Sequence, residues 1–462
     1  MHNKPDILEI LGRTQTGEYC TQKEWDTKRI PLTIRSILKE HDLAGACNPD
    51  EPVNTDFDLA DRFYAAGYQA ALELGYLCTD TERIVGVSQE ELDNALKYAP
   101  AEIWVGEGKD ATLLRARTPS DPYPMKAATS LGITVSEDVM PDMLYLIARE
   151  PEVDILEAGS MITVRGREVL SGTPIETLMG YEYGVMHREA RRRAGREGMG
   201  AIGSASAVTE FGQFGAYGTP GGFRTSDLAL ILFPSEMKVD YRTLHKVVHT
   251  LNMGGTLKCD SPTMIGGMPG PAEGATVSSI ACALLSYAIL QNHVGGGEIY
   301  DVRYLSNVNR EGLWALSVIY QALSRNTHTL CHGIANQVSG PGTENLLREI
   351  ATGVSVLAAS GSSLTTGPRS AGGKLTDFIT PLECRFVAEV SHAASAMSIE
   401  NVKGVVQALL PKYEDSIKEP DLGIPFQKAY NMDTLEPTPE WEAMYRKVKA
   451  ECIELGIPLD SH

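Results

Sequence analysis

The sequence predicts a (β/α)₈ barrel of parallel strands, formed by residues 121–410 of a 462-residue chain. Short apolar or β-branched runs alternate here with segments of helical periodicity, which is the pattern of successive βα units. Eight such runs can be counted, the number that closes a barrel of this type. Acidic or glycine-rich segments follow several runs, where such barrels hold their chemistry. An open, doubly wound sheet is the alternative fold.

The expected elements follow one another along the chain. The strands are expected within 126–135, 153–159, 198–205, 227–233, 256–262, 298–306, 327–335 and 362–367. The helices between and after them are expected at 137–150, 174–197, 241–252, 274–292, 309–325, 341–359 and 383–410.

Two further segments flank the barrel. Residues 1–120 form a mostly helical extension, in which "SQEELDNALKYA" begins with a serine cap and an acidic first turn. Residues 102–117 alternate around Gly-Lys-Asp and predict a hairpin. Residues 411–462 form a C-terminal tail with one amphipathic helix, "TPEWEAMYRKVKAECIELG".

Composition narrows the class of partner. The net charge of −19 argues against nucleic acid or an anionic membrane surface as the main partner. The first ten residues lack a basic region followed by an apolar run, so no secretory signal is expected. No uninterrupted apolar run is long enough to cross a bilayer. The 8 cysteines form no CxxC pair and are expected as reduced thiols, so we expect a cytoplasmic protein.

Candidate site residues come from the segments after the strands. Glu236 follows the fourth strand, Asp260 and Glu273 follow the fifth, and Gln337 follows the seventh. These carboxylates could attract a cationic ligand or, if burial raises the pKa, protonate a leaving group. Asp227 begins a strand and is therefore expected at the opposite face, where it would serve stability.

The stretch "SAVTEFGQFGAYGTPGGF", residues 206–223, is expected to be a long glycine-rich loop after the third strand. Its rings Phe211, Phe214 and Tyr217 could line a pocket for a cation, because aromatic faces attract positive charge. The alternative is that the rings pack the loop onto the barrel, with the glycines allowing close approach of the backbone.

Two other sequence patterns bear on phosphate binding and on metal binding. "GPRSAGGK", residues 367–374, follows the eighth strand and could hold a phosphate there, which keeps a phosphate-substrate lyase or aldolase as an alternative. His328 and His332, like His245 and His249, are four residues apart. The first pair is expected on a strand, too far apart to share a metal, and the second lacks a third ligand, so no metal site is expected.

Nine stretches in chain order also match one family of proteins. They are "CTQKEWDTKRIP", "CTDTERIV", "GEGKDA", "SEDV", "VRGRE", "AGREGMG", "GGFRTSD", "SEMKVD" and "GPGTEN". The chain thus resembles the monomethylamine corrinoid methyltransferases of methanogenic archaea. The resemblance implies a (β/α)₈ barrel in a homohexamer. It also implies transfer of a methyl group from methylamine to the cobalt of a separate corrinoid protein.

At one position this sequence departs from the family that it resembles. Its members carry pyrrolysine in the loop after the third strand, and an ungapped count from "GMG" puts Phe211 at that position. A phenyl ring has no electrophilic imine, so a non-pyrrolysine member with a quaternary or otherwise activated amine as methyl donor is expected. No D-x-H-x-x-G pattern is present, so the corrinoid (cobalamin) would come on a partner protein. A non-catalytic methylamine-binding homologue is a further alternative.

Overall fold

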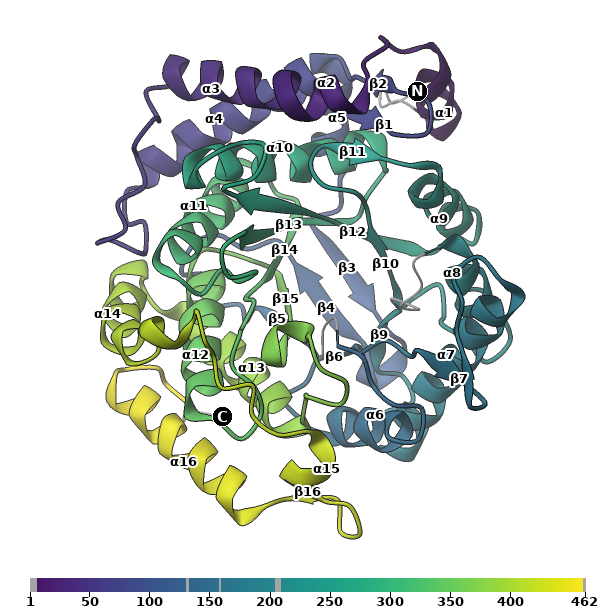
Figure 1. Ribbon diagram of the computed structural model, residues 1–462, viewed down its shortest axis with the longest axis vertical. Coiled ribbons are helices and arrows are strands. Elements are labelled where there is room, and N and C mark those ends of the chain that lie inside the picture. The colour runs from purple at the N-terminus through teal and green to yellow at the C-terminus, as the bar shows by residue number, and fades with distance from the viewer. Residues whose placement is uncertain (1–5, 130–132, 158, 204–208, 460–462) are drawn as a thin grey trace.

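Eight parallel strands form a closed barrel at the centre of the computed structural model, which describes residues 6–129, 133–157, 159–203 and 209–459 (Figure 1). Each strand pairs in parallel with the next, and the last pairs with the first through Leu364 and Lys126. The predicted barrel is therefore confirmed. Its strands are β5 (Lys126–Thr129), β6 (Ile155–Glu157), β9 (Gly200–Gly203), β10 (Leu228–Leu232), β12 (Thr256–Ile265), β13 (Val294–Asp301), β14 (Leu330–Ile334) and β15 (Leu364–Thr366).

One strand begins earlier than the sequence predicted. β13 starts at Val294, not at residue 298, because the glycine run before it belongs to the sheet. A Cβ on Gly295 would lie 2.7 Å from the Tyr287 ring, and one on Gly296 would lie 1.9 Å from the His332 carbonyl oxygen. These glycines thus permit close packing within the barrel wall, although glycine usually marks a turn.

Helices surround the barrel in a ring. They are α6 (Met140–Arg149), α7 (Pro174–Arg193), α8 (Glu210–Ala216), α9 (Tyr241–Asn252), α10 (Ala272–Ile289), α11 (Arg310–Asn326), α12 (Glu344–Ala359), α13 (Pro381–Ala393) and α14 (Ile399–Leu409). The single helix predicted at 383–410 is wrong, because the chain turns at Ala394–Ala396 and starts again with Ser398 as a cap.

The stretch 206–223 is not a loop throughout, since α8 occupies its centre; residues 204–208 lie outside the described part. α8 is the third helix of the ring, and its glycines allow it to touch α7. A Cβ on Gly180 would lie 2.0 Å from the Gly212 carbonyl oxygen, and one on Gly215 would lie 2.1 Å from that of Thr177. Close helix packing, and not an approach to a ligand, accounts for these glycines.

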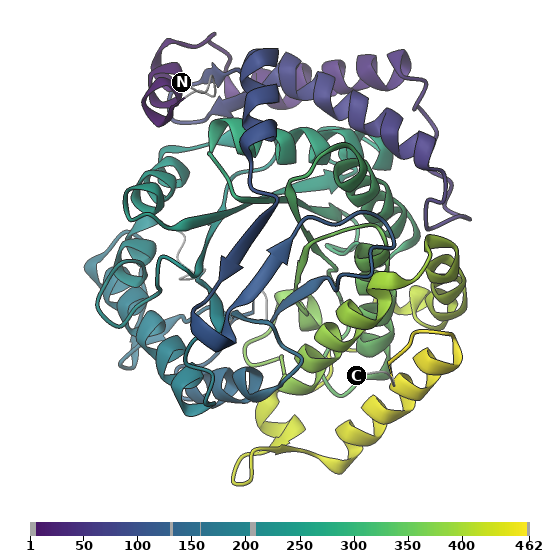
Figure 2. The same ribbon diagram turned by 180° about the vertical axis from the view of Figure 1, so that it is seen from behind.

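A hairpin closes the N-terminal end of the barrel, as Figure 2 shows from behind. It consists of β3 (Glu102–Val105) and β4 (Thr112–Arg115), as predicted. The Gly106 amide donates to the Ser226 carbonyl oxygen at 2.8 Å, which ties the hairpin to the start of β10. Val105 and Leu114 pack against inward-facing side chains of the barrel: Ala128, Ile155, Ile202, Leu228, Leu230, Val294, Leu330 and Leu364.

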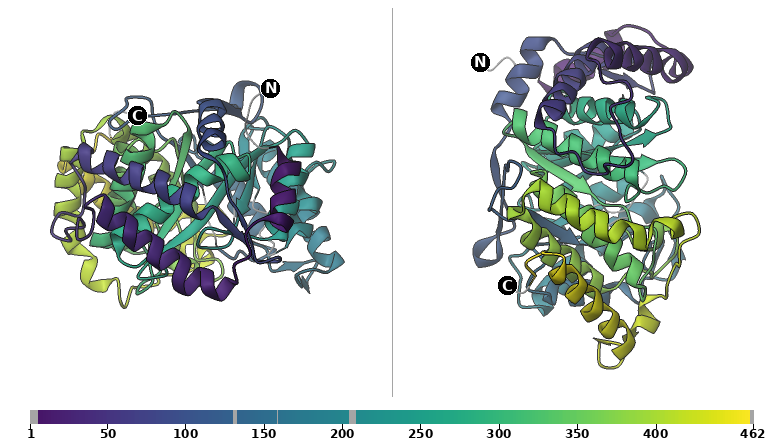
Figure 3. Two further views of the ribbon diagram at one scale, coloured as in Figure 1. Left: turned by 90° about the horizontal axis from the view of Figure 1, so that it is seen from above. Right: turned by 90° about the vertical axis from the view of Figure 1, so that its left-hand side faces the viewer.

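The N-terminal extension packs along one side of the barrel (Figure 3). It contains α1 (Ile7–Thr16), α2 (Gln22–Glu24), a π-helical turn (Trp25–Arg29), α3 (Ile30–Glu40), α4 (Phe57–Leu74), β1 (Tyr76–Cys78), β2 (Arg83–Val85) and α5 (Gln89–Tyr98). α4 packs on α10 and α11, and β1 pairs with β11 (Lys238–Val239). α10 is long and apolar enough to cross a membrane, but all of its residues are buried in this packing, as in the core helix of a globular protein.

The C-terminal tail covers another part of the helical ring. It contains α15 (Phe426–Ala429), the short pair β16 (Tyr430–Asn431) and β17 (Glu436–Pro437), and α16 (Pro439–Glu454). α16 packs on α12, and the Trp441 indole nitrogen donates to Thr380 Oγ1 at 3.0 Å. The predicted amphipathic helix is therefore confirmed.

Asp227 lies at the start of β10, beside the hairpin and away from the strand ends that carry chemistry. It is fully buried, accepts from the Ala201 amide at 3.0 Å, and pairs with Arg191 at 3.1 Å and Arg224 at 2.9 Å. Its predicted structural position is therefore confirmed.

Asp227→Ala should lower the free energy of unfolding by about 3–5 kcal/mol, because it leaves the buried Arg191 guanidinium without a counter-charge. Urea unfolding followed by circular dichroism measures this loss. Glu189→Ala, which removes the partner of the exposed Arg192, is the control and should leave the unfolding midpoint nearly unchanged. Equal midpoints for both variants would contradict the role given to Asp227.

Candidate active site inside the barrel

The interior of the barrel is apolar at one end and polar at the other. Towards the hairpin it is filled by the aliphatic side chains that pack against Val105 and Leu114. Further along the strands, towards their carboxyl ends, the inward positions hold Lys258 and Asp260 on β12, Glu298 on β13 and His332 on β14. Glu157 ends β6 on the same face as Ile155, by strand alternation. The polar groups thus face one another near the carboxyl ends of the strands, where barrels of this class place their chemistry.

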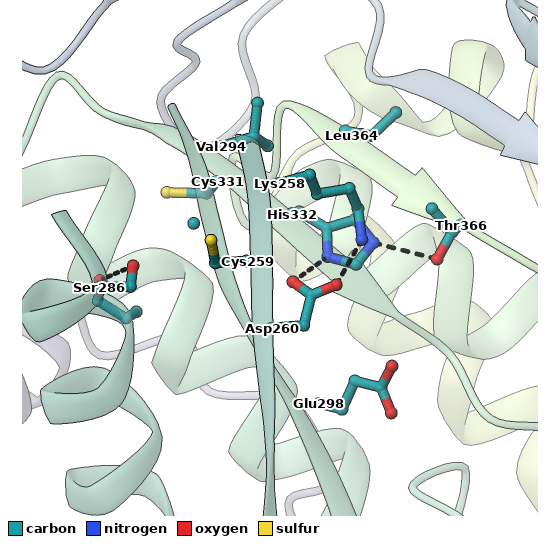
Figure 4. Close-up of polar contacts among 12 residues, drawn as sticks. Lys258, Cys259, Asp260, Ser286, Val294, Glu298, Cys331, His332, Leu364 and Thr366 are labelled. Carbon is teal, nitrogen blue, oxygen red and sulfur yellow. Dashed lines mark hydrogen bonds and ion pairs between the residues drawn. The ribbon is translucent and has the colours of Figure 1, made fainter. Parts of the chain in front are cut away.

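A chain of polar contacts crosses this interior, as Figure 4 shows. The Lys258 amine forms an ion pair with one Asp260 oxygen. His332 Nδ1 lies 3.1 Å from the other Asp260 oxygen, and His332 Nε2 lies 3.0 Å from Thr366 Oγ1. An ionised carboxylate can only accept, so Nδ1 carries the proton and Nε2 accepts from the Thr366 hydroxyl.

The charges in this chain are set by burial and by the partners. Burial alone would raise the pKa of Asp260, but its contacts with His332 and Lys258 outweigh it and hold that pKa below its ordinary value. Burial lowers the pKa of His332, so we take the imidazole as neutral at neutral pH and Lys258 as the counter-ion of Asp260. The pair is therefore a fixed, fully buried anion and cation.

Two more carboxyl groups, those of Glu157 and Glu298, face this pair, and the pKa values of both are raised. Burial raises the pKa of Glu157 well above its ordinary value, and Asp260 and Glu298 add to this while Lys258 opposes it. Burial also raises the pKa of Glu298, helped by Asp260, and Glu298 accepts a hydrogen bond from the Tyr300 hydroxyl. Glu157 Oε2 has no hydrogen-bond partner among the described residues. Carboxyl groups that are shielded from solvent in this way can hold a cationic amine or donate a proton.

Gln337 lies at the same end of the barrel. Its side-chain oxygen accepts from the Arg369 amide at 2.9 Å, and the Arg369 guanidinium lies over the Tyr300 ring at 5.4 Å. The Gln337 side-chain nitrogen is buried and has no partner among the described residues. Of the residues singled out in the sequence, Asp260 and Gln337 are the two that the structure brings to this end of the barrel interior.

Glu236 and Glu273 lie where the N-terminal extension meets the barrel. Glu236 Oε1 accepts from the Met264 amide at 2.6 Å, and its carbonyl oxygen accepts from the Trp25 indole at 3.3 Å. Glu273 Oε1 accepts from the Cys47 amide at 3.1 Å. Trp25 and Cys47 belong to the extension, so the Glu236 backbone carbonyl and the Glu273 carboxylate tie the extension to the barrel, while the Glu236 carboxylate contacts β12. No hydrogen bond among the described residues joins either carboxylate to the interior groups.

The three rings of the stretch 206–223 do not enclose one pocket. Phe211 is 40% exposed and packs edge-on against Phe214, and both line a hollow on the outer surface beside α7. Tyr217 is instead buried and stacks on Phe223 at 5.2 Å. The expected cation cage is therefore not formed by these rings, because α8 stands in the helical ring outside the barrel.

Four residues of the interior were not predicted as site residues from the sequence, although a signal for them was present: Lys258, Glu157, Glu298 and His332. In "TLKCDSP" the lysine and the aspartate are two residues apart, so they share one face of the strand. A charged residue at an inward position of a barrel strand needs a partner, and that need points to a polar interior.

His328 lies at the other end of the barrel, where its ring contacts the Ala99 carbonyl oxygen at 3.1 Å. Among the described residues, no three His, Cys, Asp or Glu side chains form a group that could hold a metal ion.

A closed parallel barrel with titratable groups at the carboxyl ends of its strands defines the class of (β/α)₈-barrel enzymes. The family profile described as monomethylamine methyltransferase MtmB matches residues 5–457, and the chain belongs to this family. It is similar to the monomethylamine methyltransferase MtmB of Methanosarcina mazei, with 30% identity over 462 residues and 98% of each chain covered.

Further relatives agree with this membership. MtmB2 of Methanosarcina acetivorans is 29% identical over 463 residues, again covering 98% of each chain. The crystal structure of the Methanosarcina barkeri monomethylamine methyltransferase superposes with a TM-score of 0.93 at 27% identity, covering 99% of both chains. A structure of the hydroxylamine complex of MtmB gives the same TM-score of 0.93.

The anchoring position of Glu236 predicts a pH-dependent stability. Burial raises the pKa of Glu236 to about 8 from an ordinary value of 4.5, so the folded chain holds a proton that the unfolded chain releases. The stabilisation is complete below the ordinary pKa and is lost as pH rises through about 8. Glu236→Gln should therefore gain at least about 2 kcal/mol relative to the wild type between pH 5 and pH 8.5. Urea unfolding at both pH values measures the gap, and a gap independent of pH would contradict the protonated, buried state.

Proposed function

We propose that this chain transfers a methyl group from a methylated amine to the cobalt of a separate corrinoid protein. The observation that carries the proposal is the interior set of Lys258, Asp260, Glu157 and Glu298 in a chain that matches a methylamine methyltransferase family over residues 5–457. The corrinoid, brought by its own protein, would supply cobalt(I) as the acceptor of the methyl group. The barrel would position the amine, exclude water and place charge.

In this proposal Asp260 is the fixed anion of the site. Lys258 neutralises one of its oxygens, and His332 orients the other by donating from Nδ1. An amine that enters this interior meets one compensated ion pair and two carboxyl groups with raised pKa values. We take Gln337 as a further substrate contact, because its unpaired amide nitrogen can donate to a ligand.

We also propose that the reaction proceeds without pyrrolysine. Phe211 lies on the outer face of the helical ring, so its side chain does not take the place of a reactive group inside the barrel. The amine would then be held by charge and hydrogen bonds and not by a covalent adduct. By likeness to the family, we expect a cytoplasmic homo-oligomer, a homohexamer, that meets its corrinoid protein at the carboxyl ends of the strands.

The test mixes the purified chain with a reduced corrinoid protein and a panel of methyl donors: mono-, di- and trimethylamine and a quaternary ammonium compound. We expect formation of methyl-cobalt, seen in the visible spectrum, with at least one donor. Tight donor binding without any methyl transfer would contradict the proposal and favour a binding protein. Donor-independent binding of phosphate at residues 367–374 would favour the phosphate-handling alternative.

Asp260→Asn should lower the transfer rate by at least about 100-fold, because it removes the fixed anion and leaves the buried Lys258 charge uncompensated beside the substrate. Phe211→Ala is the contrasting variant and should keep the rate within about threefold, since that ring faces outwards. Stopped-flow measurement of methyl-cobalt formation gives both rates. A large loss in Phe211→Ala with an unchanged rate in Asp260→Asn would move the site from the interior to α8.

A further inference from the structure

Glu157 is a buried carboxyl group of the barrel interior with an oxygen atom that no described residue contacts by a hydrogen bond. It is 1% exposed, and its Oε2 atom has no hydrogen-bond partner among the described residues. Its strand neighbour on β9 is Ile202, which is apolar and packs with the residues that fill the barrel. A buried carboxyl oxygen without a partner is costly, and a catalytic role is one of the reasons for which native proteins keep such a group.

The groups that face Glu157 come from strands across the barrel. β12 brings Lys258 and Asp260, and β13 brings Glu298, and all three act on the pKa of Glu157. β14 adds His332, which is held on Asp260. On the neighbouring strands the described inward residues Ala128 and Ile202 are apolar. Lys126, at the other end of β5, is paired with Asp154 at 3.2 Å.

Lys258 is the cation that acts on all three carboxyl groups, while Arg369 acts in addition on Glu298. Lys258 is committed to Asp260 by a direct ion pair, so Glu157 has no counter-ion of its own. Two carboxyl groups beside a buried anion cannot both ionise in a medium of low polarity. The group without a partner is the one that keeps its proton, and that proton faces the interior.

We propose that Glu157 is the proton donor to the amine that leaves when the methyl group is transferred. This rests on the proposed function and names its substrate class: a primary, secondary or tertiary methylamine that enters with a free electron pair on nitrogen. Glu157 lies beside the interior groups that would hold such an amine, and its Oε2 atom is free to meet the nitrogen.

The step balances in atoms and charge. The carbon–nitrogen bond breaks as the methyl carbon bonds to the electron pair of the reduced cobalt, which is the acceptor under the proposed function. Nitrogen keeps the electrons of the broken bond and takes the proton of the Glu157 carboxyl group. The products are methyl-cobalt, a neutral amine with one methyl group fewer, and ionised Glu157. Asp260 with Lys258 stays unchanged, so the charge of the pair does not enter the balance.

A quaternary ammonium donor separates this role from a purely structural one. It leaves as a neutral tertiary amine and needs no proton. In Glu157→Gln, we expect methyl transfer from the mono-, di- or trimethylamine donor to fall at least about 100-fold, the lower end of what a positioned general acid contributes. Any transfer from the quaternary donor should remain within about threefold. Glu157→Asp, which restores a carboxyl group, should recover part of the lost rate.

Glu389→Gln is the matched control, because Glu389 is a largely buried carboxylate that contacts Arg385 and Tyr445 at the C-terminal tail, away from the interior. It should leave all rates unchanged. Unchanged amine rates in Glu157→Gln, or an equal loss with amine and quaternary donors, would overturn the assignment.

A second measurement does not depend on methyl transfer. Difference infrared spectra of the wild type and Glu157→Gln at neutral pH should reveal the carbonyl stretching band of one protonated carboxylic acid that the variant lacks. Absence of this band would overturn the role of Glu157 even if transfer occurs. Presence of the band in a chain that transfers no methyl group would reject the proposed function and confine Glu157 to a buried acid.

Discussion

The ion pair between Lys258 and Asp260 is the interaction on which the interior of this barrel depends. Two charges in a site without solvent are stable only together, and each oxygen of Asp260 has its own partner, the Lys258 amine or His332 Nδ1. The pair fixes the tautomer of the imidazole. It also acts on the two neighbouring carboxyl groups, whose pKa values are raised mainly by burial. Loss of either partner would leave a buried charge and change the whole set.

The apolar end of the barrel makes this polar end possible. The hairpin and the aliphatic layer beneath it exclude water from below, and the inward side chains of eight strands fill the space. In such surroundings each electrostatic interaction is stronger than in water. The N-terminal extension is tied to the barrel through Trp25, which donates to the Glu236 carbonyl oxygen, and through Cys47, which donates to the Glu273 carboxylate.

Much of the fold was readable from the sequence, because it depends on local periodicity. Eight strands, the hairpin at 102–117 and the amphipathic helix of the tail were placed correctly from alternation and helical spacing. The prediction failed where glycine can indicate either a loop or a site of close packing. Gly295 and Gly296 lie in β13, and Gly212 and Gly215 lie in α8. Both are sites of close packing, and a packing partner cannot be read from the segment itself.

The candidate site divides in the same way. The sequence by itself determined the class of fold, the family, the position of Asp227 at the stability face of the barrel, and Asp260 as a site candidate, since these rest on strand order and on matched motifs. The tertiary structure decided which groups meet Asp260. Lys258, Glu298, His332 and Glu157 stand on four different strands, and barrel closure turns them to one interior. The physical reason is that charge, burial and pKa are properties of neighbours in space, and closure of the ring pairs residues as far apart in the sequence as Lys126 and Leu364.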